Sequence, residues 1–275
     1  MNQLERKYAR LVDIIKGYGS VLVAYSGGVD STLVLRAAKD AFGADPGKVL
    51  AVTADSYTVP RGEVGTAAKI CKKIGTKHVT ITTDELKNKH FARNPVDRCY
   101  YCKKELIGKL KKIASKMGIN VIADGTNASD VTGDFRPGMR ALKESKVHSP
   151  LAEAGLTKED VRKISRALGL ETSDKPSSAC LASRFPYGSP LTREKINRVA
   201  KAEDFIKKKY GIRVVRVRDY DGLARLEVAK GEIGKLLKKN AFESISKKLK
   251  SFGFTYVTLD MEGYRSGSMN EILQI

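Results

Sequence analysis

The chain has 275 residues, 41% of them hydrophobic, which is enough for one or two domains with buried cores. No apolar run approaches the roughly 18 residues of a membrane-spanning helix, which argues against an integral membrane protein. The net charge of +20 indicates anionic ligands such as nucleotides, RNA or an acidic partner. The N-terminus begins an amphipathic helix and lacks the apolar segment of a signal peptide, so we expect a cytoplasmic protein.

The first 170 residues alternate short apolar runs with helical periodicity, which predicts a parallel α/β sheet. The expected strands cover residues 21–25, 49–54, 78–81 and 121–123. The expected helices cover residues 30–42, about 60–74, 102–117 and 158–168. Because ligands of such sheets bind outside the carboxyl ends of the strands, the functional residues are expected in the loops that follow each strand.

The loop at residues 26–28 (Ser-Gly-Gly) separates the first strand from a helix and is the most informative stretch of the chain. Two adjacent glycines let the backbone turn sharply and bring its N–H groups close to a ligand. With the helix N-terminus, these groups form a site for an anion, most naturally a pyrophosphate. Ser26 and Ser31 can add hydroxyl donors, and Asp30 could hold a magnesium ion. The common phosphate loop, GxxxxGK[ST], is absent, and with it that motif's lysine.

The remainder of the chain predicts a polar loop followed by a small α+β domain. Residues 171–190 are rich in Ser, Pro and Gly, which is typical of a connection between domains. The expected elements are a helix capped by Thr192 that runs to about Tyr210, a hairpin of 212–217 and 224–228 with its turn at 219–222, helices at 231–239 and 241–251, and a strand at 254–259. Residues 201–250 hold 15 Lys or Arg against 7 Asp or Glu, which is also compatible with an ordinary lysine-rich surface.

Two of the four cysteines form a Cys-Tyr-Tyr-Cys motif, Cys99 and Cys102, at the start of a predicted helix. This spacing lets two thiolates bind one metal centre, and a helix N-terminus lowers thiol pKa values. Redox pairs, zinc sites and iron–sulfur sites all use such pairs, so the motif alone leaves the chemistry open. Cys71 lies among apolar residues of an amphipathic helix and is expected to be a core residue.

Cys180 stands in the polar loop between domains, four residues before Arg184, where packing gives no reason for a cysteine. We therefore predict a functional thiol beside a cationic neighbour. Together with Cys99 and Cys102 it would hold a [4Fe-4S] cluster in which one iron has no protein ligand. That iron could carry a hydrosulfide and act as a renewable sulfur donor.

Several segments together resemble one known family, in the same order and over nearly the whole chain. They are SGGVDS, NPVDRCYYCKKEL, ADGTNASD, GDFRPGMRAL, KPSSACLASRFPYG, RVRDYDGLARLEV and GYRSGSMNE. The family is that of the ATP-dependent sulfur transferases of the LarE type, which build the nickel-pincer nucleotide of lactate racemase. Only the SGGxDS segment is shared with the wider superfamily of ATP pyrophosphatases.

The resemblance implies a domain organisation. It places a PP-loop ATP-pyrophosphatase domain of the adenine nucleotide alpha hydrolase-like α/β class at residues 1–172. A cysteine loop at 173–190 follows, and then a small α+β domain at 191–275 for substrate binding and oligomerisation. By analogy, the chain is expected to form a homo-oligomer, a hexamer in the family.

The resemblance also implies a reaction. ATP with Mg²⁺ adenylylates a carboxylate of pyridinium-3,5-biscarboxylic acid mononucleotide and releases pyrophosphate, after which sulfur displaces AMP and leaves a thiocarboxylate. In members with a single cysteine, the residue matching Cys180 gives up its own sulfur and becomes dehydroalanine. Because this chain also carries the CxxC pair, it resembles the cluster-bearing subgroup, in which sulfide or another donor can supply sulfur catalytically.

Residue roles follow from the same resemblance. The expected catalytic residues are Cys180, Cys99, Cys102 and Asp30, and the three cysteines are also the expected metal ligands. The residues expected to bind ATP or substrate are Ala24, Ser26, Gly27, Gly28, Asp30, Ser31, Thr53, Gly125, Asn127, Arg140, Arg184, Arg216 and Arg218, with Asp124, Asp130 and Arg136 as further candidates on the ATP side. Arg216 and Arg218 share one face of a strand and could clamp a substrate phosphate with Arg184. Solvated surface arginines, and a plain helix cap at Asn127 or Asp130, are the alternatives.

Three other functions compete with this interpretation. A tRNA sulfurtransferase uses the same ATP loop and fits the charge of +20, but it usually carries an added RNA-binding module that we do not find. A ligase resembling NAD or GMP synthetase leaves the cysteines without a role. A non-catalytic nucleotide-binding regulator predicts slow ATP turnover that does not depend on the thiols. Salt-sensitive binding of tRNA would favour the first alternative.

Overall fold

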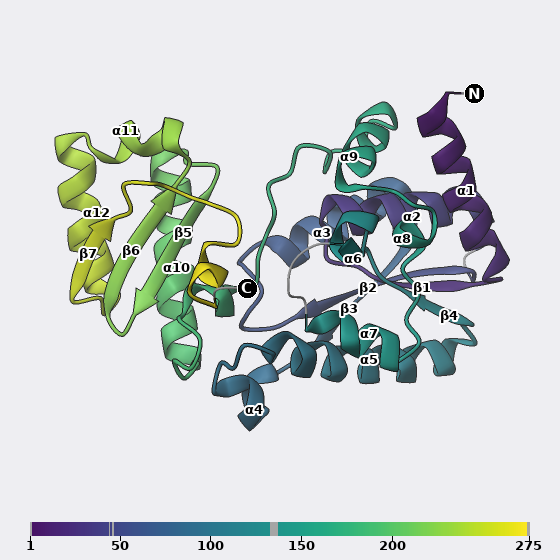
Figure 1. Ribbon diagram of the computed structural model, residues 1–275, viewed down its shortest axis with the longest axis horizontal. Coiled ribbons are helices and arrows are strands. Elements are labelled where there is room, and N and C mark those ends of the chain that lie inside the picture. Colours follow the sequence, from purple (N-terminus) through teal and green to yellow (C-terminus); the bar gives the residue numbers. More distant parts are fainter. Residues whose placement is uncertain (1, 44, 46, 133–136, 274–275) are drawn as a thin grey trace. The chain divides into compact units, whose positions relative to one another are not determined.

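The computed structural model describes residues 2–43, 45, 47–132 and 137–273, and the chain divides into two units (Figure 1). The first unit consists of Met1–Ser56, Gly62–Thr83 and Cys99–Ser177, and the second of Tyr57–Arg61, Asp84–Arg98 and Ser178–Ile275. The break after Ser177 falls inside the loop expected at 173–190. Two short segments that the sequence assigned to the first domain, 57–61 and 84–98, belong to the second unit.

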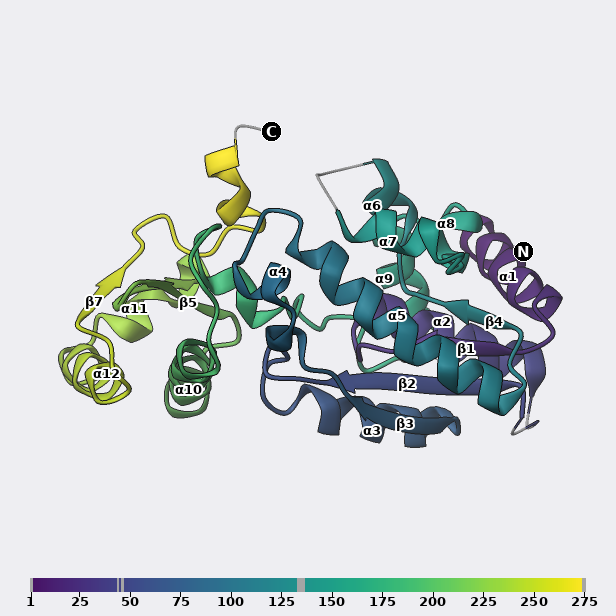
Figure 2. The ribbon, with the colours of Figure 1, turned by 90° about the horizontal axis from the view of Figure 1, so that it is seen from below.

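The first unit is built on a four-stranded parallel sheet, as the alternation of strands and helices predicts. Its strands are β1 (Val21–Ala24), β2 (Val49–Asp55), β3 (Lys77–Thr82) and β4 (Val121–Ala123), in the order β3-β2-β1-β4 (Figure 2). The apolar runs of β1 and β2 are almost completely buried because helices cover both faces of the sheet. Strand β3 lies at an edge and is correspondingly more exposed.

Helices form a layer on each face of this sheet (Figure 1). One face is covered by α1 (Gln3–Gly17), α2 (Val29–Phe42), α3 (Glu63–Ile74) and α9 (Lys158–Ala167), and the other by α5 (Arg98–Met117). Helix α5 packs through Leu110 and Ala114, and α2 packs through Leu33 and Val34. The helices predicted from periodicity are therefore confirmed, although α5 begins at Arg98 instead of residue 102 and so contains both cysteines of the motif.

The strand order places the first loop at a topological switch point. The chain moves from β1 outward to β2 and β3, and then returns to add β4 on the other side of β1. In parallel sheets, ligands bind at the carboxyl ends of the strands where the direction of winding reverses. The loops after β1 and β4 therefore meet at the position where a ligand is expected.

Several short helices were not predicted from the sequence. They are α6 (Ala128–Thr132), α7 (Gly138–Glu144) and α8 (Pro150–Glu153) in the first unit, and α4 (Lys89–Ala92) in the second. Each has seven residues or fewer, so none contains enough turns to show an apolar periodicity in the sequence.

The second unit is a mixed three-stranded sheet with helices, in agreement with the predicted α+β class. Its main elements are α10 (Arg193–Tyr210), β5 (Val215–Tyr220), β6 (Leu223–Val228), α11 (Ile233–Leu236), α12 (Lys239–Ser251) and β7 (Tyr256–Leu259), with 3-10 turns at Leu181–Arg184 and Ser268–Leu273. Strand β6 pairs antiparallel with β5 and parallel with β7. Thr192 caps α10 as predicted, because its side chain accepts a hydrogen bond from the Lys195 N–H.

The hairpin turn lies later than the sequence suggested. Strand β5 continues through Tyr220, and the turn consists of Asp221 and Gly222 alone, both with positive φ, 50° and 98°. An Asp-Gly pair is favoured in two-residue hairpin turns because their twist matches that of the strands. As a result, Arg218 and Asp219 belong to the ladder and lie opposite Arg225 and Ala224.

A search of the described residues finds no helix that is both long and apolar enough to cross a membrane.

Candidate active site

The loop after β1 is closed by hydroxyl groups from its two ends. The Oγ atoms of Ser26 and Ser31 lie 3.0 Å apart, and the Ser26 N–H donates to Ser31 Oγ at 3.3 Å. Gly27 has a φ of 70°, in the left-handed region that strains any residue with a β-carbon. Gly28 is the N-cap of α2, so the first N–H groups of that helix border the loop. Hydroxyl and N–H donors are thus gathered at one helix end, as a pyrophosphate site requires.

Asp30, in the first turn of α2, has protein partners at both carboxylate oxygens. Its Oδ1 accepts from Asn127 Nδ2 at 3.1 Å, and its Oδ2 forms an ion pair with Lys158. A magnesium ion bound to Asp30 would take the place of the Lys158 ammonium, whose side chain is 42% exposed. Asn127 also caps α6, because its Oδ1 accepts from the Asp130 N–H at 3.2 Å. Asn127 therefore caps α6, as the plain interpretation expected, and also contacts the start of α2, while its role in binding ATP stays a prediction.

The loop after β4 packs directly against the start of α2. A β-carbon built on Gly125 would lie 2.8 Å from the backbone nitrogen of Ser31 and 3.2 Å from Asp30 Cβ. The neighbouring Asp124 is held in place by the Thr126 and Ser149 hydroxyls, which donate to it at 2.7 and 2.8 Å. Gly125 thus lets two loops approach more closely than any other residue would allow.

Substitution of Gly125 by Ala is expected to damage the nucleotide site. The added methyl group must push the Ser31 backbone away, which costs about 1–3 kcal/mol of stability by overpacking. Because Ser31 closes the loop, ATP affinity should fall at least about tenfold, the usual effect of losing a charged hydrogen bond. Titration calorimetry with ATP and thermal unfolding measure both effects.

Gly65→Ala is the matched control for this substitution. Gly65 is exposed within α3 and has no heavy atom within 4 Å of a built β-carbon. Alanine there should leave ATP binding unchanged and stabilise the helix by up to about 1 kcal/mol. Equal ATP affinity in Gly125→Ala and Gly65→Ala would contradict the assigned role of Gly125.

The end of β2 is tied to the same loop by a chain of hydrogen bonds. Thr53 Oγ1 donates to the Tyr25 carbonyl at 2.8 Å and lies 2.8 Å from His78 Nε2. Since the threonine proton is used on Tyr25, His78 acts as the donor in the second bond. Burial lowers the pKa of His78, which favours the neutral ring. Thr53 therefore supports the β1 loop from behind, and Ala24, at the end of β1, pairs with Val52.

A lysine that sequence reasoning missed also reaches this loop. Lys175 Nζ donates to the carbonyl oxygen of Gly27 at 3.0 Å and forms an ion pair with Glu63 at 2.7 Å. It comes from the polar segment after α9, far from the loop in sequence, so no local motif could have indicated it. Lys158 was missed for the same reason.

The CxxC cysteines lie in the first turn of α5, three residues apart and hence on one face of the helix. Cys99 is exposed and Cys102 is partly buried. The first turn of α5 packs against α7, where a β-carbon on Gly138 would lie 3.1 Å from Lys103 Cδ and 3.7 Å from Cys99 Cβ. Lys103 Nζ in turn contacts Asp124 Oδ2 at 3.3 Å, which links this helix end to the loop after β4.

Arg140 lies on the exposed side of α7 and contacts Tyr100, the first tyrosine of the Cys-Tyr-Tyr-Cys motif. Its guanidinium stacks on Tyr100 at 4.2 Å from the ring centre, and its Nε donates to Glu144 at 3.1 Å. The Tyr100 hydroxyl donates to the same glutamate at 2.8 Å. The role of Arg140 as a nucleotide-site cation stays a prediction. Arg136, the other candidate cation, lies outside the described residues.

Within the second unit, the backbone of Cys180 is fixed and its side chain is exposed. The Cys180 carbonyl accepts from the Ser183 hydroxyl at 2.7 Å and from Arg184 Nη1 at 3.3 Å. The next residue, Leu181, donates its N–H to the carbonyl of Thr58 at 2.8 Å. Several hydrogen bonds thus hold the main chain at Cys180, while the residue itself is exposed; its reactivity stays a prediction.

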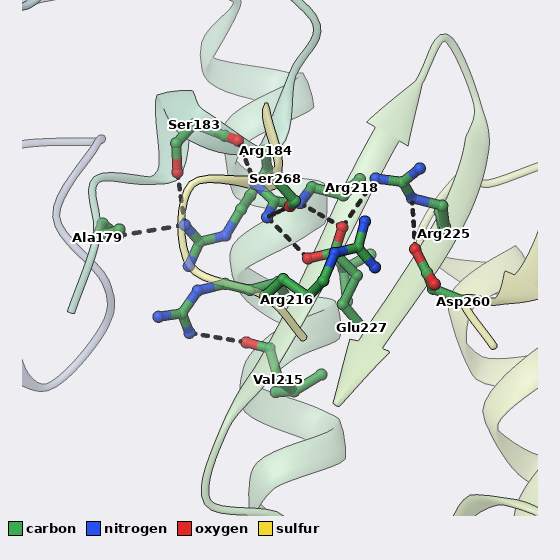
Figure 3. A network of polar contacts seen from close by, with 12 residues as sticks. Ala179, Ser183, Arg184, Val215, Arg216, Arg218, Arg225, Glu227, Asp260 and Ser268 are labelled. Carbon is green, nitrogen blue, oxygen red and sulfur yellow. Dashed lines mark hydrogen bonds and ion pairs between the residues drawn. The ribbon is translucent and has the colours of Figure 1, made fainter. Parts of the chain in front are cut away.

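Arg184 is a fully buried residue that ties the Cys180 loop to α10 (Figure 3). Its guanidinium forms two hydrogen bonds with the Glu203 carboxylate, at 2.6 and 3.1 Å, and its Nη1 donates to Ser183 Oγ at 2.8 Å. Burial alone would raise the pKa of Glu203, but the charge of Arg184, its hydrogen bonds and the charges of Arg216 and Lys207 together outweigh burial and lower the pKa. The geometry therefore gives Arg184 a task in holding the loop, and contact with a substrate phosphate stays a prediction.

Arg216 and Arg218 of β5 are buried beside the same loop (Figure 3). Arg218 binds Glu227 with two hydrogen bonds, at 2.9 and 2.7 Å, and donates to the Ser183 carbonyl at 2.6 Å. Arg216 donates to the Val215 carbonyl and stacks on Tyr264 at 5.1 Å. Arg225 also donates to Glu227, at 2.9 Å, and pairs with Asp260, so four of the described guanidinium groups lie with three carboxylates. Burial, followed by the charge of Arg184, lowers the pKa of Arg216.

The three cysteines expected to bind a cluster do not form one described metal-binding group. Within the residues that the structure describes, no three His, Cys, Asp or Glu side chains gather to hold a metal ion. Cys99 and Cys102 belong to the first unit and Cys180 to the second. Cys71 is buried in the core as predicted, and burial raises the pKa of its thiol to about 11.

The fold and the loop together define a class of protein. A parallel sheet covered by helices on both faces, with a Ser-Gly-Gly loop between β1 and α2 at the switch point, is a PP-loop ATP-pyrophosphatase domain. In agreement with this assignment, a family model described as NAD synthase matches residues 6–100, the part of the chain that contains the loop.

Comparison with curated proteins then places the chain in one family. It is 39% identical to the pyridinium-3,5-bisthiocarboxylic acid mononucleotide synthase of Lactiplantibacillus plantarum, over 99% of this chain and 97% of that protein. It is 41% identical to the uncharacterized protein slr1717 of Synechocystis sp., over 98% of this chain and 99% of the relative. The uncharacterized protein MJ0830 of Methanocaldococcus jannaschii is 30% identical over 90% of this chain and 91% of its own length. The chain belongs to the family of the pyridinium-3,5-bisthiocarboxylic acid mononucleotide synthase.

Proposed function

We propose that this protein is an ATP-dependent sulfur transferase that converts a carboxylate of pyridinium-3,5-biscarboxylic acid mononucleotide into a thiocarboxylate. The observation that carries the proposal is the full-length identity of 39% to a protein named for the corresponding bisthiocarboxylic product. The loop formed by Ser26, Gly27 and Ser31 supports the ATP-dependent half of the reaction. The exposed thiol of Cys180 supports the sulfur-transferring half.

The reaction has two displacement steps, the first at the α-phosphorus of ATP and the second at the acyl carbon of the substrate. In the first, a carboxylate oxygen of the substrate attacks the α-phosphorus of ATP, forming an acyl adenylate and releasing pyrophosphate. In the second, a sulfur nucleophile attacks the acyl carbon and AMP leaves. Activation is needed because a carboxylate has no good leaving group of its own. Nucleotidyl transfer depends on positioning and charge neutralisation more than on a strong base.

The chain's own residues can supply this positioning. The N–H groups and hydroxyls of the β1 loop bind the leaving pyrophosphate, and the start of α2 favours its negative charge. Asp30 is the carboxylate best placed to hold Mg²⁺ once Lys158 moves away. Magnesium would neutralise the phosphate oxygens of ATP.

The arginine cluster of the second unit is proposed to bind the substrate phosphate. Arg216 and Arg218 project from one face of β5. Burial is the main cause that lowers the pKa of Arg216, and the charge of Arg184 adds to it, so a bound anion would stabilise the charged form of Arg216. The Cys180 loop belongs to the same unit, and its Ser183 carbonyl accepts a hydrogen bond from Arg218. A substrate phosphate at Arg216 would thus be bound next to the segment that carries the reactive thiol.

Cys99, Cys102 and Cys180 are proposed to hold a [4Fe-4S] cluster, as in the three-cysteine subgroup. Two thiols three residues apart on one face at the start of α5 fit half of such a site. When bound, the cluster would supply a labile sulfur that sulfide or another donor renews. The exposure of Cys99 and Cys180 leaves both thiols accessible for ligation.

The protein is also proposed to work as a cytoplasmic homo-oligomer, with six subunits by analogy. Large apolar side chains lie exposed on the second unit, with Leu237 and Phe242 both 58% and Tyr256 64% exposed. Phe242 lines an apolar pocket together with Leu226, Ile245 and Val257, and exposed apolar patches of this kind mark interaction surfaces. A second copy of the chain is the proposed occupant.

The decisive experiment is an anaerobic assay on the reconstituted protein. Incubation with ATP, Mg²⁺ and the biscarboxylic mononucleotide should release pyrophosphate and increase the substrate mass by the exchange of oxygen for sulfur. Iron and sulfide analysis should show a cluster in the wild type that Cys99→Ala loses. Cys71→Ala, which changes a buried thiol, should retain it. ATP turnover without any thiolated mononucleotide, or with tRNA as the thiolated product, would overturn the proposed substrate.

A further inference from the structure

The ammonium group of Lys175 lies at the β1 loop, between the Gly27 carbonyl and Glu63 of α3. Its Nζ lies 3.0 Å from the Gly27 carbonyl and 2.7 Å from Glu63 Oε2. Glu63 is the first residue of α3, and the start of this helix lies close to the loop. A β-carbon built on Gly27 would lie 3.2 Å from Ala67 Cβ. The ammonium group is therefore held at the loop itself and not at a distant surface.

The backbone of Lys175 is anchored independently of its side chain. Arg162 of α9 donates to the carbonyl oxygens of Ser173 and Lys175 at 2.6 and 3.3 Å. The Lys175 N–H donates to the Thr172 carbonyl at 3.1 Å. The four methylene groups of the side chain span the distance from this fixed backbone to the loop, where the ammonium group lies. A structure that only needed a surface ion pair with Glu63 would not require this anchoring.

We propose that Lys175 is an ATP-binding residue whose ammonium group moves from Gly27 and Glu63 to the pyrophosphate portion of ATP. This proposal rests on the ATP-dependent reaction proposed above and adds a residue to its site. Lys175 would supply the cation that a lysine provides in the GxxxxGK[ST] loop, although it comes from another part of the chain. Its three N–H donors suit this exchange, since the two contacts described use two of them.

The energetics favour such an exchange. The side chains of Lys175 and Glu63 are 19% and 22% exposed, so the ammonium group is partly accessible and can exchange one anionic partner for another. A tri- or tetra-anionic phosphate chain at the same distance attracts the ammonium more strongly than one carboxylate does. Glu63 thus keeps the lysine at the loop before ATP binds and competes only weakly once ATP is present.

The test compares the binding of ATP, pyrophosphate and AMP to the wild type and to Lys175→Gln, by titration calorimetry. Loss of the ammonium should weaken ATP and pyrophosphate about ten- to a hundredfold. AMP lacks the pyrophosphate portion, so its affinity should change by less than about twofold. Lys175→Arg, which keeps the charge, should recover most of the affinity. Lys73→Gln is the control, because Lys73 forms an exposed ion pair with Glu171 in the same unit.

Glu63→Gln separates phosphate binding from a merely structural ion pair. If the pair only stabilised the loop, Glu63→Gln and Lys175→Gln would weaken ATP alike. The proposal instead requires that Glu63→Gln leaves ATP affinity equal or raises it, by up to about fivefold. The double variant Glu63→Gln/Lys175→Gln removes both charges and allows the same measurement if the single lysine variant does not fold.

The outcomes also distinguish this inference from the proposed function. Unchanged affinity for ATP and pyrophosphate in Lys175→Gln, with thiocarboxylate still formed by the wild type, overturns the role of Lys175 alone. Selective loss of ATP and pyrophosphate binding supports it, even if the wild type proves to thiolate another substrate. A wild type that binds neither ATP nor pyrophosphate overturns both.

Discussion

Cys180→Ala is expected to abolish thiocarboxylate formation while pyrophosphate is still released in the presence of the mononucleotide substrate. In the proposed reaction the acyl adenylate forms at the β1 loop of the first unit, whose residues do not include Cys180. Removal of the thiol should therefore interrupt only the second displacement. Mass spectrometry of the mononucleotide and a coupled pyrophosphate assay on the same sample measure the two steps separately.

The local structure explains why the substitution should act on chemistry and not on folding. The Cys180 loop is held by its carbonyl groups, which accept from Ser183 and Arg184, while the thiol is exposed and fills no core position. An alanine keeps each of these backbone contacts. The unfolding temperature should therefore stay close to that of the wild type.

Cys71→Ala is the matched control among the cysteines. Cys71 is fully buried in the core of the first unit, and its pKa of about 11 keeps it a neutral thiol near pH 7. It should lose some stability and retain sulfur transfer. Thiocarboxylate formation that persisted in Cys180→Ala would show that the sulfur passes through another group. With the wild type, more than one product per chain in the presence of sulfide would exclude a sacrificial cysteine.

Much of the first unit could be predicted because its signals are local. The run Val21–Ala24 followed by Ser26, Gly27 and Gly28 contains the strand, the turn and the helix start within a dozen residues. Buried parallel strands are continuous apolar runs, so the sequence also located β2 and β4. The order of the strands then follows from the return of the chain to β1, which places the loop of Gly125 beside that of Ser31.

The charged residues around the site could not be predicted, because their partners are distant in sequence. Lys158 and Lys175 approach Asp30 and Gly27 across 128 and 148 residues, and neither lies in a recognisable pattern. A lysine in a polar segment is ordinarily a solvated surface residue. Only the folded chain shows that these two ammonium groups belong to the phosphate loop.

For the arginines of β5, the sequence predicted the face of the strand but not their burial. Alternation in β5 correctly placed Arg216 and Arg218 on one face, but their burial depends on carboxylates from other elements. Glu203 and Asp204 are adjacent in α10. The spacing of Ile196, Val199 and Ile206 places Glu203 on the apolar face of the helix, but the sequence does not indicate which residue neutralises its charge. The contact between Glu203 and the Arg184 guanidinium is a tertiary feature.

Glu203→Ala is expected to destabilise the second unit by about 3–5 kcal/mol, the usual cost of removing one partner from a buried ion pair. The side chains of Glu203 and Arg184 are 4% and 1% exposed, so Arg184 would be left as a charge without water around it. The Val217 N–H, which donates to Glu203 Oε1 at 3.0 Å, would lose its acceptor as well. Calorimetric unfolding of the full chain, with circular dichroism as a second probe, measures the loss.

Asp204→Ala provides the comparison at the adjacent residue. Asp204 pairs with Lys208 at 2.8 Å within the same helix, and the two side chains are 31% and 77% exposed. Its removal should change stability by no more than about 1 kcal/mol. If the two variants were equally stable, the buried network would not be what holds the Cys180 loop to α10.

The stability that Glu203 contributes should depend on pH, which a contribution from packing alone would not. Arg184 lowers the pKa of Glu203 below its ordinary value of 4.5, so the carboxylate stabilises the folded state fully at any pH well above 4.5. As the pH falls below that value, the unfolded chain binds a proton before the folded chain does, and the stabilisation is lost. The difference in stability between the wild type and Glu203→Gln, which keeps the shape but not the charge, should therefore be constant near neutral pH and shrink only in acid. A difference that stayed the same down to the acid transition would assign the effect to shape and not to the charge of Glu203.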